Sequence, residues 1–484
     1  MPRLEAWQAR PMWGRNRLLS GGIPTSMVRM TGSLERYPAR VSLYWYSAIL
    51  AIGTLILLLP VSFSPTSAPL SVIDALFTAT SALCVTGLSV RSTANDFSGF
   101  GQFVILVLIQ LGGVGIMTVT TFVLFQLGGR GGLRHRAVIA ETLGAGPNQD
   151  LKWILGRVLM LSLAIELLGV VCLFARLIFL QPTSQALWNA IFLSVSAFCN
   201  AGFALHDSSL MPFRDDWAIN STIMALIISG GFGFPVMIDL TRTIPRGWPN
   251  AWYDLHLHSK LMITASLTAI GLGTLFTLIL EWDGVLASLP AEHKLLPSLF
   301  HSVSCRTAGF NSVDIGSLRD ATLFFSIILM VIGAGPCSTA GGVKISTVAL
   351  LIMQAYSRFR GRSHINLFRR TIPKESIDRA LATIMFYLLI VTLAFITILV
   401  VEEDHALAES TPWQFRDIMF EVVSALGTVG LSTGITASFS TTGKAILIAL
   451  MFMGRLGPIT VFAALALSRS KHTKEYASEE PLLG

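Results

Sequence analysis

The feature that most constrains this chain is a series of long apolar segments separated by short polar connections. Two clear examples run from Val41 to Val61 and from Phe103 to Leu127, and each reaches the roughly 20 residues that a helix needs to cross the hydrocarbon layer. Of the 484 residues, 52% are hydrophobic and only 13% are charged, a composition typical of repeated membrane spans. The sequence therefore predicts an all-α membrane protein.

The charged residues lie mostly in the connections, and these alternate in sign along the chain. Basic residues dominate the segment 1–40 and recur in every second connection, whereas Asp207, Glu281 and Glu402 belong to acidic connections between them. Basic loops stay in the cytoplasm. We therefore expect a multi-pass protein of the cell (inner) membrane, surrounded by lipid, with about eight full spans and with both the basic segment 1–40 and the tail 468–484 in the cytoplasm.

Composition also excludes several classes. The net charge of +7 is spread over short loops and forms no basic domain face, so we expect no nucleic-acid partner. No nucleotide fingerprint of the GxGxxG kind follows a strand, so no organic cofactor is expected in this chain. The cysteines have no CxxC spacing, which indicates packing thiols rather than a zinc site or disulfides: Cys84, Cys172, Cys199, Cys305 and Cys337.

Four segments between the spans are too short or too interrupted to cross a membrane, and they resemble one another. They read DALFTATSALCVTGLS, NAIFLSVSAFCNAGFA, LPSLFHSVSCRTAGFN and DIMFEVVSALGTVGLS. Their ungapped alignment puts a glycine in one column, followed each time by Leu or Phe; the glycines are Gly87, Gly202, Gly309 and Gly430. Six positions earlier stand Ser81, Ser196 and Ser424, but Val303 in the third copy, which is the outlier.

Each copy predicts a short helix that ends at the shared glycine. Asp74, Asn189 and Asp417 open three of the copies, and Asp and Asn are favoured helix N-caps. About ten helical residues span roughly 15 Å, half a bilayer, so the chain must return to the surface it came from. We predict four tandem units of span, half-helix with loop, and span, covering residues 41–127, 152–240, 256–353 and 380–467.

Non-helical backbone at membrane depth must be buried in protein or face water, so we expect the four loops to meet around a pseudo-fourfold axis. Their carbonyl oxygens could then replace the hydration shell of a potassium ion, and glycine keeps side chains out of the lumen. The alternative is ordinary turns between membrane helices. The predicted filter residues are Val85, Thr86, Gly87, Asn200, Ala201, Gly202, Thr307, Ala308, Gly309, Thr428, Val429 and Gly430.

The second span of the third unit is interrupted by small residues and proline, which permit unwinding. We expect a mobile loop below the filter that acts as a gate, a packing kink being the alternative; its residues are Gly333, Gly335, Pro336, Ser338, Thr339, Ala340, Gly341 and Gly342. Arg455 lies within the last span, and an intramembrane charge needs water or a partner. We expect it to bind carbonyls of this loop when the gate is closed, unless it snorkels to the cytoplasmic surface.

Two further basic residues lie next to the interrupted span and inside the third loop. Lys344 follows the interrupted segment and either anchors its end or is solvated at the inner mouth. Arg306, inside the third loop, is expected to brace that loop through an acidic partner, for which we suggest Glu421 in the fourth short helix.

The motifs SALCVTGLS, SCRTAGFN and GAGPCSTAGGVK resemble those of the Trk/Ktr/HKT superfamily of potassium transporters, over almost the whole chain. With one span before the first loop, the chain is most similar to the Ktr-type membrane subunit. The resemblance implies potassium uptake, a pore loop gated as above with a pore arginine at the place of Arg455, a homodimer, and a cytosolic nucleotide-binding regulatory subunit of the RCK/KTN type as partner. In plant members a serine at the first filter glycine accompanies sodium selectivity, so Gly87 favours K⁺.

Other functions remain to be weighed. Na⁺ could be a coupling, activating or conducted ion, since the sequence does not separate passive from ion-coupled flow. A secondary transporter would have two inverted halves with matching broken helices, which four like-oriented copies argue against. A membrane-embedded enzyme needs a catalytic cluster, and no HExxH motif and no paired intramembrane aspartates are present; we expect no enzymatic activity.

Overall fold

The computed structural model describes residues 38–65, 67–130, 151–247, 250–362, 364–368, 370–408 and 414–457. The segment 1–37, most of the predicted cytoplasmic N-terminal segment, and the tail 468–484 lie outside these residues. Within the described ranges the chain is mostly helical. Its β-structure there is a two-residue hairpin, in which Asn366 pairs with Thr371 and Leu367 with Arg370, and two isolated bridges, Phe63 with Phe97 and Ile332 with Val343. The all-α prediction is confirmed.

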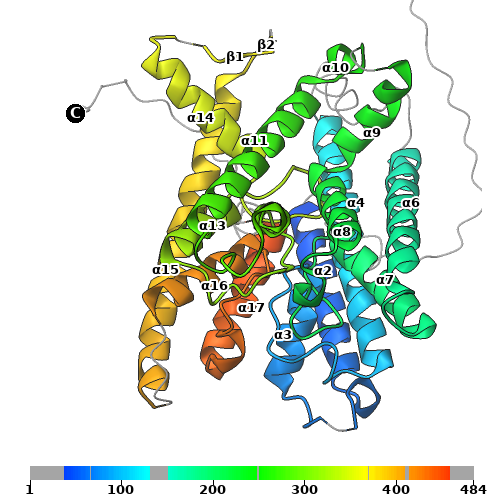
Figure 1. Cartoon of the computed structure of the whole chain (residues 1–484). Helices are drawn as coiled ribbons and strands as arrows, with labels where there is room; N and C mark the ends of the chain where they lie inside the picture. Colours follow the sequence, from blue (N-terminus) through cyan, green and yellow to red (C-terminus); the bar gives the residue numbers. More distant parts are fainter. Residues whose placement is uncertain are drawn as a thin grey trace, which may run out of the picture.

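Figure 1 shows the helices coloured in chain order, from blue at the N-terminus to red at the C-terminus. In chain order the elements are α2 (Pro38–Leu57), α3 (Val72–Leu83), α4 (Gly99–Arg130), α6 (Leu151–Leu177), α7 (Thr183–Phe198), α8 (Trp217–Phe232), α9 (Phe234–Thr243), α10 (Asn250–Asp254), α11 (Leu257–Leu280), α12 (Leu295–Ser304), α13 (Asp320–Val331), α14 (Ile345–Phe359), β1 (Asn366–Leu367), β2 (Arg370–Thr371), α15 (Lys374–Ala408), α16 (Phe415–Gly427) and α17 (Thr441–Leu456). The long helices α6 and α15 lie on opposite flanks, with the short helices α3 and α16 between them (Figure 1).

Not every expected span is a straight helix. Three stretches of the described chain, Gly156–Leu177, Leu257–Leu280 and Lys374–Glu403, are long and apolar enough to cross a membrane alone. The span expected over 217–240 is instead divided into α8 and α9, which are bent by 104°. The bend lies at Gly233, whose φ of 81° is left-handed, and Pro235 follows in the first turn of α9. A glycine there meets the backbone angles that other residues avoid. Together the two helices are long and apolar enough for one span with a break.

The third unit is interrupted where the sequence predicted. Helix α13 ends at Val331 after 12 residues, and α14 begins at Ile345. Residues 332–344 between them form no helix. We call this segment the intramembrane loop.

The short helices α3, α7, α12 and α16 have 12, 16, 10 and 13 residues, and the expected N-caps were wrong. Helix α3 is capped by Ser71, whose hydroxyl accepts from the Asp74 amide at 3.1 Å, and α7 begins six residues before Asn189. Asp417 is the third residue of α16, where its carboxylate accepts from the Gln414 amide in a capping box. Acidic side chains in the first turn serve as well as a cap would, because they interact favourably with the helix dipole.

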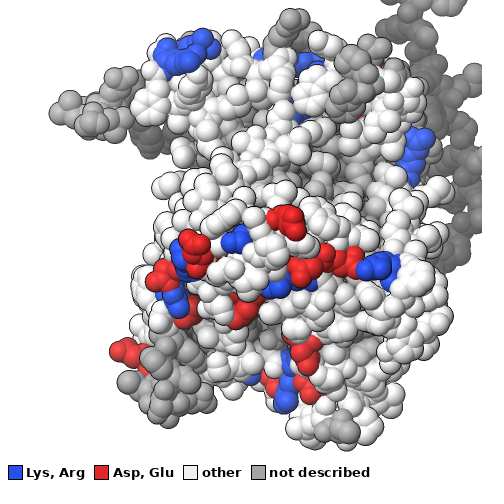
Figure 2. Space-filling view, in the orientation of Figure 1, with Lys and Arg blue, Asp and Glu red and all other residues white. Residues whose placement is uncertain are grey.

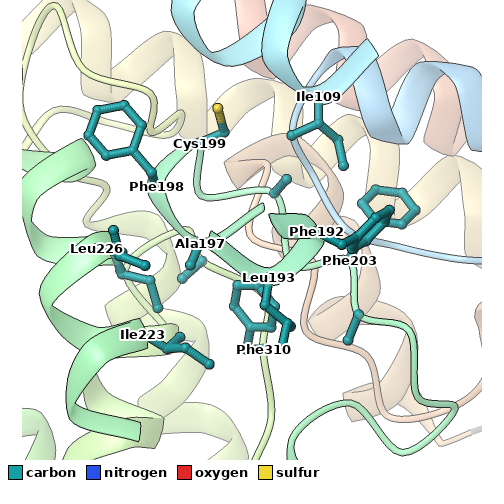
Figure 3. Close-up of a cluster of buried hydrophobic side chains, with 14 of the residues drawn as sticks. Ile109, Phe192, Leu193, Ala197, Phe198, Cys199, Phe203, Ile223, Leu226 and Phe310 are labelled. Carbon is teal, nitrogen blue, oxygen red and sulfur yellow. The ribbon is translucent and has the colours of Figure 1, made fainter. Parts of the chain in front are cut away.

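Large apolar side chains fill the space around the second short helix (Figure 3). Phe192 and Phe198 of α7 are fully buried, and Phe310, which follows the glycine of the third loop, lies in the same cluster. Burying a side chain of this size contributes roughly 1.5–3 kcal/mol. The packing therefore fixes α7 against its neighbours and holds the loops that follow the short helices in place.

The surface has a largely white band with few charged side chains (Figure 2). Lys and Arg gather at the end of the molecule near α14, whereas acidic side chains gather in the opposite half (Figure 2). The exposed arginines of the α14 and hairpin region are Arg358, Arg360, Arg362 and Arg370. Such a band matches a protein embedded in a bilayer.

Candidate functional site

The four shared glycines lie against one another in a closed ring. A Cβ atom added to Gly87 would lie 2.6 Å from the carbonyl oxygen of Ala201, in the second loop. In the same way Gly202 faces Ala308, Gly309 faces Val429, and Gly430 faces Thr86 of the first loop. The four loops thus follow one another around one axis in sequence order, and the fourth faces the first. No position in the ring has room for a side chain.

Each loop also carries a second left-handed residue, two positions before its glycine. These residues are Val85, Asn200, Thr307 and Thr428, with φ between 49° and 66°, and the glycines have φ between 71° and 98°. The residue between each pair is not left-handed. Left-handed backbone is unfavourable for β-branched residues, and such strain persists mainly at functional sites. The same alternation of a left-handed residue, a residue that is not left-handed and a left-handed glycine occurs in all four loops.

The backbone amides of the loops are bonded to the short helices instead of pointing at the axis. The Thr86 amide donates to the Ser81 carbonyl at 2.8 Å, and the Val429 amide to the Ser424 carbonyl at 2.8 Å. The Gly87 and Gly430 amides donate to the hydroxyls of the same two serines, at 3.1 Å each. The donors are thereby removed from the axis, and the acceptor carbonyls are left for it.

The third loop, the outlier in the alignment, uses a serine one residue later. In the second loop the Ser196 hydroxyl donates to the Phe203 carbonyl at 2.8 Å. In the third, Ser304 donates to the Phe310 carbonyl, and its own carbonyl accepts from the Ala308 amide at 3.0 Å. The sequence comparison missed this because it required a fixed offset from the glycine.

A vestibule of about 600 Å³ opens on one side of the ring and has all four glycines in its lining. Its walls carry Asp207 of the predicted acidic connection, together with charged side chains that sequence analysis did not single out: Arg91, Asp96 and Asp314. Asp207 accepts from Ser92 and from the Asn95 side-chain amide. Next to it, burial lowers the pKa of His206, and the charge of Asp207 acts in the opposite direction.

The intramembrane loop is fastened to the filter segments and to α8. The Gly335 amide donates to the Gly231 carbonyl at 2.8 Å. The Thr339 hydroxyl donates to the carbonyl of Phe198, the last residue of α7, at 3.1 Å. A Cβ on Gly341 would overlap the Thr428 side chain. The loop therefore lies directly against the second and fourth filter loops.

The remaining predicted gate residues belong to the same contacts. The Gly333 amide donates to the Val343 carbonyl at 2.9 Å, and Ser338 bonds the Gly335 carbonyl at 2.6 Å. The carbonyl of Pro336 lies close to Gly233, at the bend between α8 and α9, and Gly342 packs on Gly333. These small residues let the loop pack tightly on its neighbours.

Two cations bind successive carbonyls of the loop. Arg455 of α17 is only 5% exposed and donates both to the Thr339 carbonyl and to the carbonyl of Gly112 in α4. The Lys344 ammonium donates to the Ala340 carbonyl at 2.7 Å. Arg455 is thus inside the protein, where it joins α4, α17 and the intramembrane loop.

The suggested pair of Arg306 and Glu421 was wrong. The Arg306 guanidinium donates to Ser266 of α11, at 3.0 Å to the hydroxyl. Glu421 accepts from the Ser432 hydroxyl at 2.5 Å, the Thr433 amide at 3.1 Å and the Thr436 hydroxyl at 2.8 Å. Because these three donors satisfy the buried carboxylate, it needs no cation.

Comparisons with known proteins point to one family. The family described as "TrkH: Cation transport protein" matches residues 46–475. "Ktr system potassium uptake protein B" of Bacillus subtilis is 37% identical over 439 residues, 90% of this chain and 95% of the relative. "Potassium/sodium uptake protein NtpJ" of Enterococcus hirae is 33% identical over 450 residues, 92% of this chain and 97% of the relative.

A solved structure has the same fold. The crystal structure of the potassium transporter TrkH from Vibrio parahaemolyticus has a TM-score of 0.68 and 19% identity, and the alignment covers 87% of this chain and 83% of the other. At this identity the similarity speaks for the arrangement of the helices.

Proposed function

We propose that this chain, which belongs to the TrkH family of cation transport proteins, is a potassium transporter. In this proposal the multi-pass membrane protein moves potassium ions across the cell membrane through the ring of Gly87, Gly202, Gly309 and Gly430. Two relatives at 37% identity are named potassium uptake proteins. The observation that carries the proposal is the ring itself, in which four loops face one another and bond their amides to the short helices.

This arrangement suits a dehydrated monovalent cation. Stacked carbonyl oxygens compensate for the water that the ion loses. The short helices α3, α7, α12 and α16 end immediately before the filter loops, so their carboxyl ends add partial negative charge near the ion. The vestibule would collect hydrated ions before they enter.

The intramembrane loop is the proposed gate, held closed by Arg455. It lies against the filter loops, and Arg455 fastens it to α4. An intramembrane arginine on the conduction path also repels cations. Opening would require these charge-assisted hydrogen bonds to break, and each contributes roughly 1.5–3 kcal/mol.

Sodium conduction or sodium coupling is the second candidate. One relative is named a potassium/sodium uptake protein. Glycine at position 87 favours potassium in our reading, because it adds no hydroxyl oxygen to the filter. The transported ion is therefore K⁺, with Na⁺ as the competing ion.

Orientation and partners follow from the charge distribution and the family. We place the arginine-rich end with α14 and the hairpin in the cytoplasm, with both termini. The relatives are named components of a Ktr system, which supports a cytosolic nucleotide-binding regulatory subunit as partner. A homodimer is part of the same proposal.

Ion uptake into liposomes that contain the purified protein tests the proposal. Radioactive rubidium should enter and be displaced by excess potassium, both with and without a sodium gradient. Equal displacement by sodium would favour the second candidate. No uptake of either ion, with or without a nucleotide-binding partner, would refute cation conduction.

A further inference from the structure

Arg306 is a buried cation whose described surroundings are electrically neutral. It is 8% exposed and directly precedes Thr307 of the third filter loop. Its two terminal nitrogens donate to Ser266, at 3.4 Å to the carbonyl and 3.0 Å to the hydroxyl. Both acceptors are uncharged, so the hydrogen bonds do not neutralise the guanidinium.

Arg306 lies two residues after the end of α12, so the partial negative charge at that carboxyl end compensates its charge in part, but no full negative charge does so within the described part of the chain. Its Nε has no hydrogen-bond partner there, and no Asp or Glu among the described residues forms an ion pair with it. An unpaired buried charge is among the most costly features of a protein interior. The cost is greater at membrane depth, where water is distant.

A small pocket lies at this side chain. Arg306 shares its lining with Ile227, Ile228, Gly231, Phe232, Val303 and Ala334. The other lining residues are apolar or glycine, so Arg306 supplies the charge of the site. Its volume is about 10 Å³, which holds one water-sized particle and excludes a carboxylate-bearing or phosphate-bearing molecule.

We propose that this pocket binds a single halide ion, chloride in the cell, as the counter-charge of Arg306. A monatomic ion is the kind of anion nearest in size to this volume, and it can accept from the free Nε. It also supplies the negative charge that the two Ser266 acceptors lack. A water molecule would satisfy Nε but leave the charge uncompensated, so we favour the anion.

The location gives the ion a structural role. The pocket joins α8, the end of α12 and Ala334 of the intramembrane loop. The same part of α8 holds that loop, because the Gly231 carbonyl accepts from the Gly335 amide. A bound halide would therefore stabilise the folded protein at the junction of filter and loop, whatever ion the protein conducts.

Bromide provides a direct test, because its anomalous scattering distinguishes it from water. Crystals of the wild-type protein grown in bromide should have anomalous density within hydrogen-bonding reach of Arg306 Nε. An empty pocket, or one with density but no anomalous signal, overturns the proposal. This result does not depend on transport, so its failure would leave the proposed function intact.

Thermal unfolding in detergent supplies the second readout. Wild-type protein should unfold at a higher temperature in chloride or bromide than in gluconate. At a halide concentration 100 times the dissociation constant, the unfolding equilibrium should shift about a hundredfold. Arg306→Met keeps apolar volume but removes the charge, and should abolish the difference.

Arg176→Gln is the matched control, since it removes an arginine from an exposed pair with Asp216 and should keep the halide effect. Equal midpoints of wild-type protein in halide and gluconate would contradict the proposal. If Arg306→Met does not fold, the bromide density in the wild-type crystals decides.

Discussion

Arg455 and Thr339 are separated by 116 residues in the sequence, and the guanidinium of one donates to the main-chain carbonyl of the other. A second nitrogen of the same guanidinium donates to Gly112, whose carbonyl also accepts from the Tyr46 hydroxyl at 3.2 Å. One side chain thus joins the first, third and fourth units beneath the filter. The gate predictions depend on this junction.

Removing either side of the junction should open the gate. Arg455→Ala, or deletion of residues 338–340, removes charge-assisted hydrogen bonds to the intramembrane loop. We expect a rise of about tenfold to a hundredfold in the open-to-closed ratio, from roughly 1.5–3 kcal/mol per contact. Rubidium flux into liposomes without a regulatory subunit measures it, and the rubidium-to-sodium ratio should stay unchanged.

Both changes act on one closed state, so combining them should add little to either alone. If each single variant conducts like the wild type, or if selectivity changes instead, the gate assignment is wrong and the loop is a structural kink.

The filter prediction uses two glycines with the same backbone strain. Gly430 and Gly434 have φ of 93° and 98°, but a Cβ on Gly430 would overlap the first loop, whereas one on Gly434 meets nothing within 4 Å. Gly430→Ala should abolish rubidium flux, and Gly434→Ala should retain most of it. Equal losses in the two variants would mean that backbone strain, not the closed ring, is responsible.

Selectivity between potassium and sodium can be tested at Gly87, the glycine of the first loop. Gly87→Ser adds a hydroxyl oxygen beside the ring. Its Cβ meets the Ala201 carbonyl oxygen at 2.6 Å, against 2.0 Å to the Thr86 carbonyl oxygen for a Cβ at Gly430, so total flux should fall without being lost, and sodium uptake should rise relative to rubidium uptake. The comparison is made in the same liposomes with both ions present. An unchanged ratio in this variant, together with unchanged ratios in variants of the other three ring glycines, would defeat the filter assignment.

Glu421 should matter for the shape of the fourth filter loop. Its carboxylate accepts from three donors of the segment that follows Gly430. Glu421→Gln replaces one acceptor oxygen with a donor, which leaves one of these bonds unmade at a cost of about 1–3 kcal/mol. We expect a lower unfolding temperature and a reduced rubidium-to-sodium ratio. Normal values of both would show that the carboxylate is dispensable.

External pH should modulate the flux through His206. Burial lowers the pKa of this residue, so it is neutral at pH 7 and gains a proton only in acid below its ordinary range. The unfolded chain then binds the proton first, and stability falls as pH falls through the ordinary histidine range. The added positive charge in the vestibule should also slow cation entry at acid pH.

His206→Gln removes the titrating group from the vestibule, and liposome flux measured between pH 5 and 8 should lose that part of its acid inhibition. A variant profile identical to that of the wild type would assign the pH dependence to another residue.

Features that depend on the backbone could be predicted from the sequence, whereas the partners of buried side chains could not. The four glycines and the break after Val331 were found because steric demands on the backbone leave few residue choices. Side-chain partners were harder: Glu421 and Arg306 are both buried, and opposite charge suggested a pair. Their real partners are hydroxyls and amides close in space, which no spacing rule reveals. The bend at Gly233 was not predicted, because apolar residues continue on both sides of it and conceal the break.

The ring is made from one chain, and this has a consequence for how it can change over time. In a channel built from four identical subunits, a mutation appears at every corner at once. Here each loop is encoded separately, so a single mutation beside a ring glycine, rather than at the glycine itself, alters one quarter of the ring while the other three loops preserve ion passage. The third loop illustrates this, because its serine, Ser304, stands one residue later than in the other loops and Arg306 lies in the same loop. Asymmetry can therefore accumulate one tolerated step at a time, and the selectivity of such a protein can drift without an inactive intermediate.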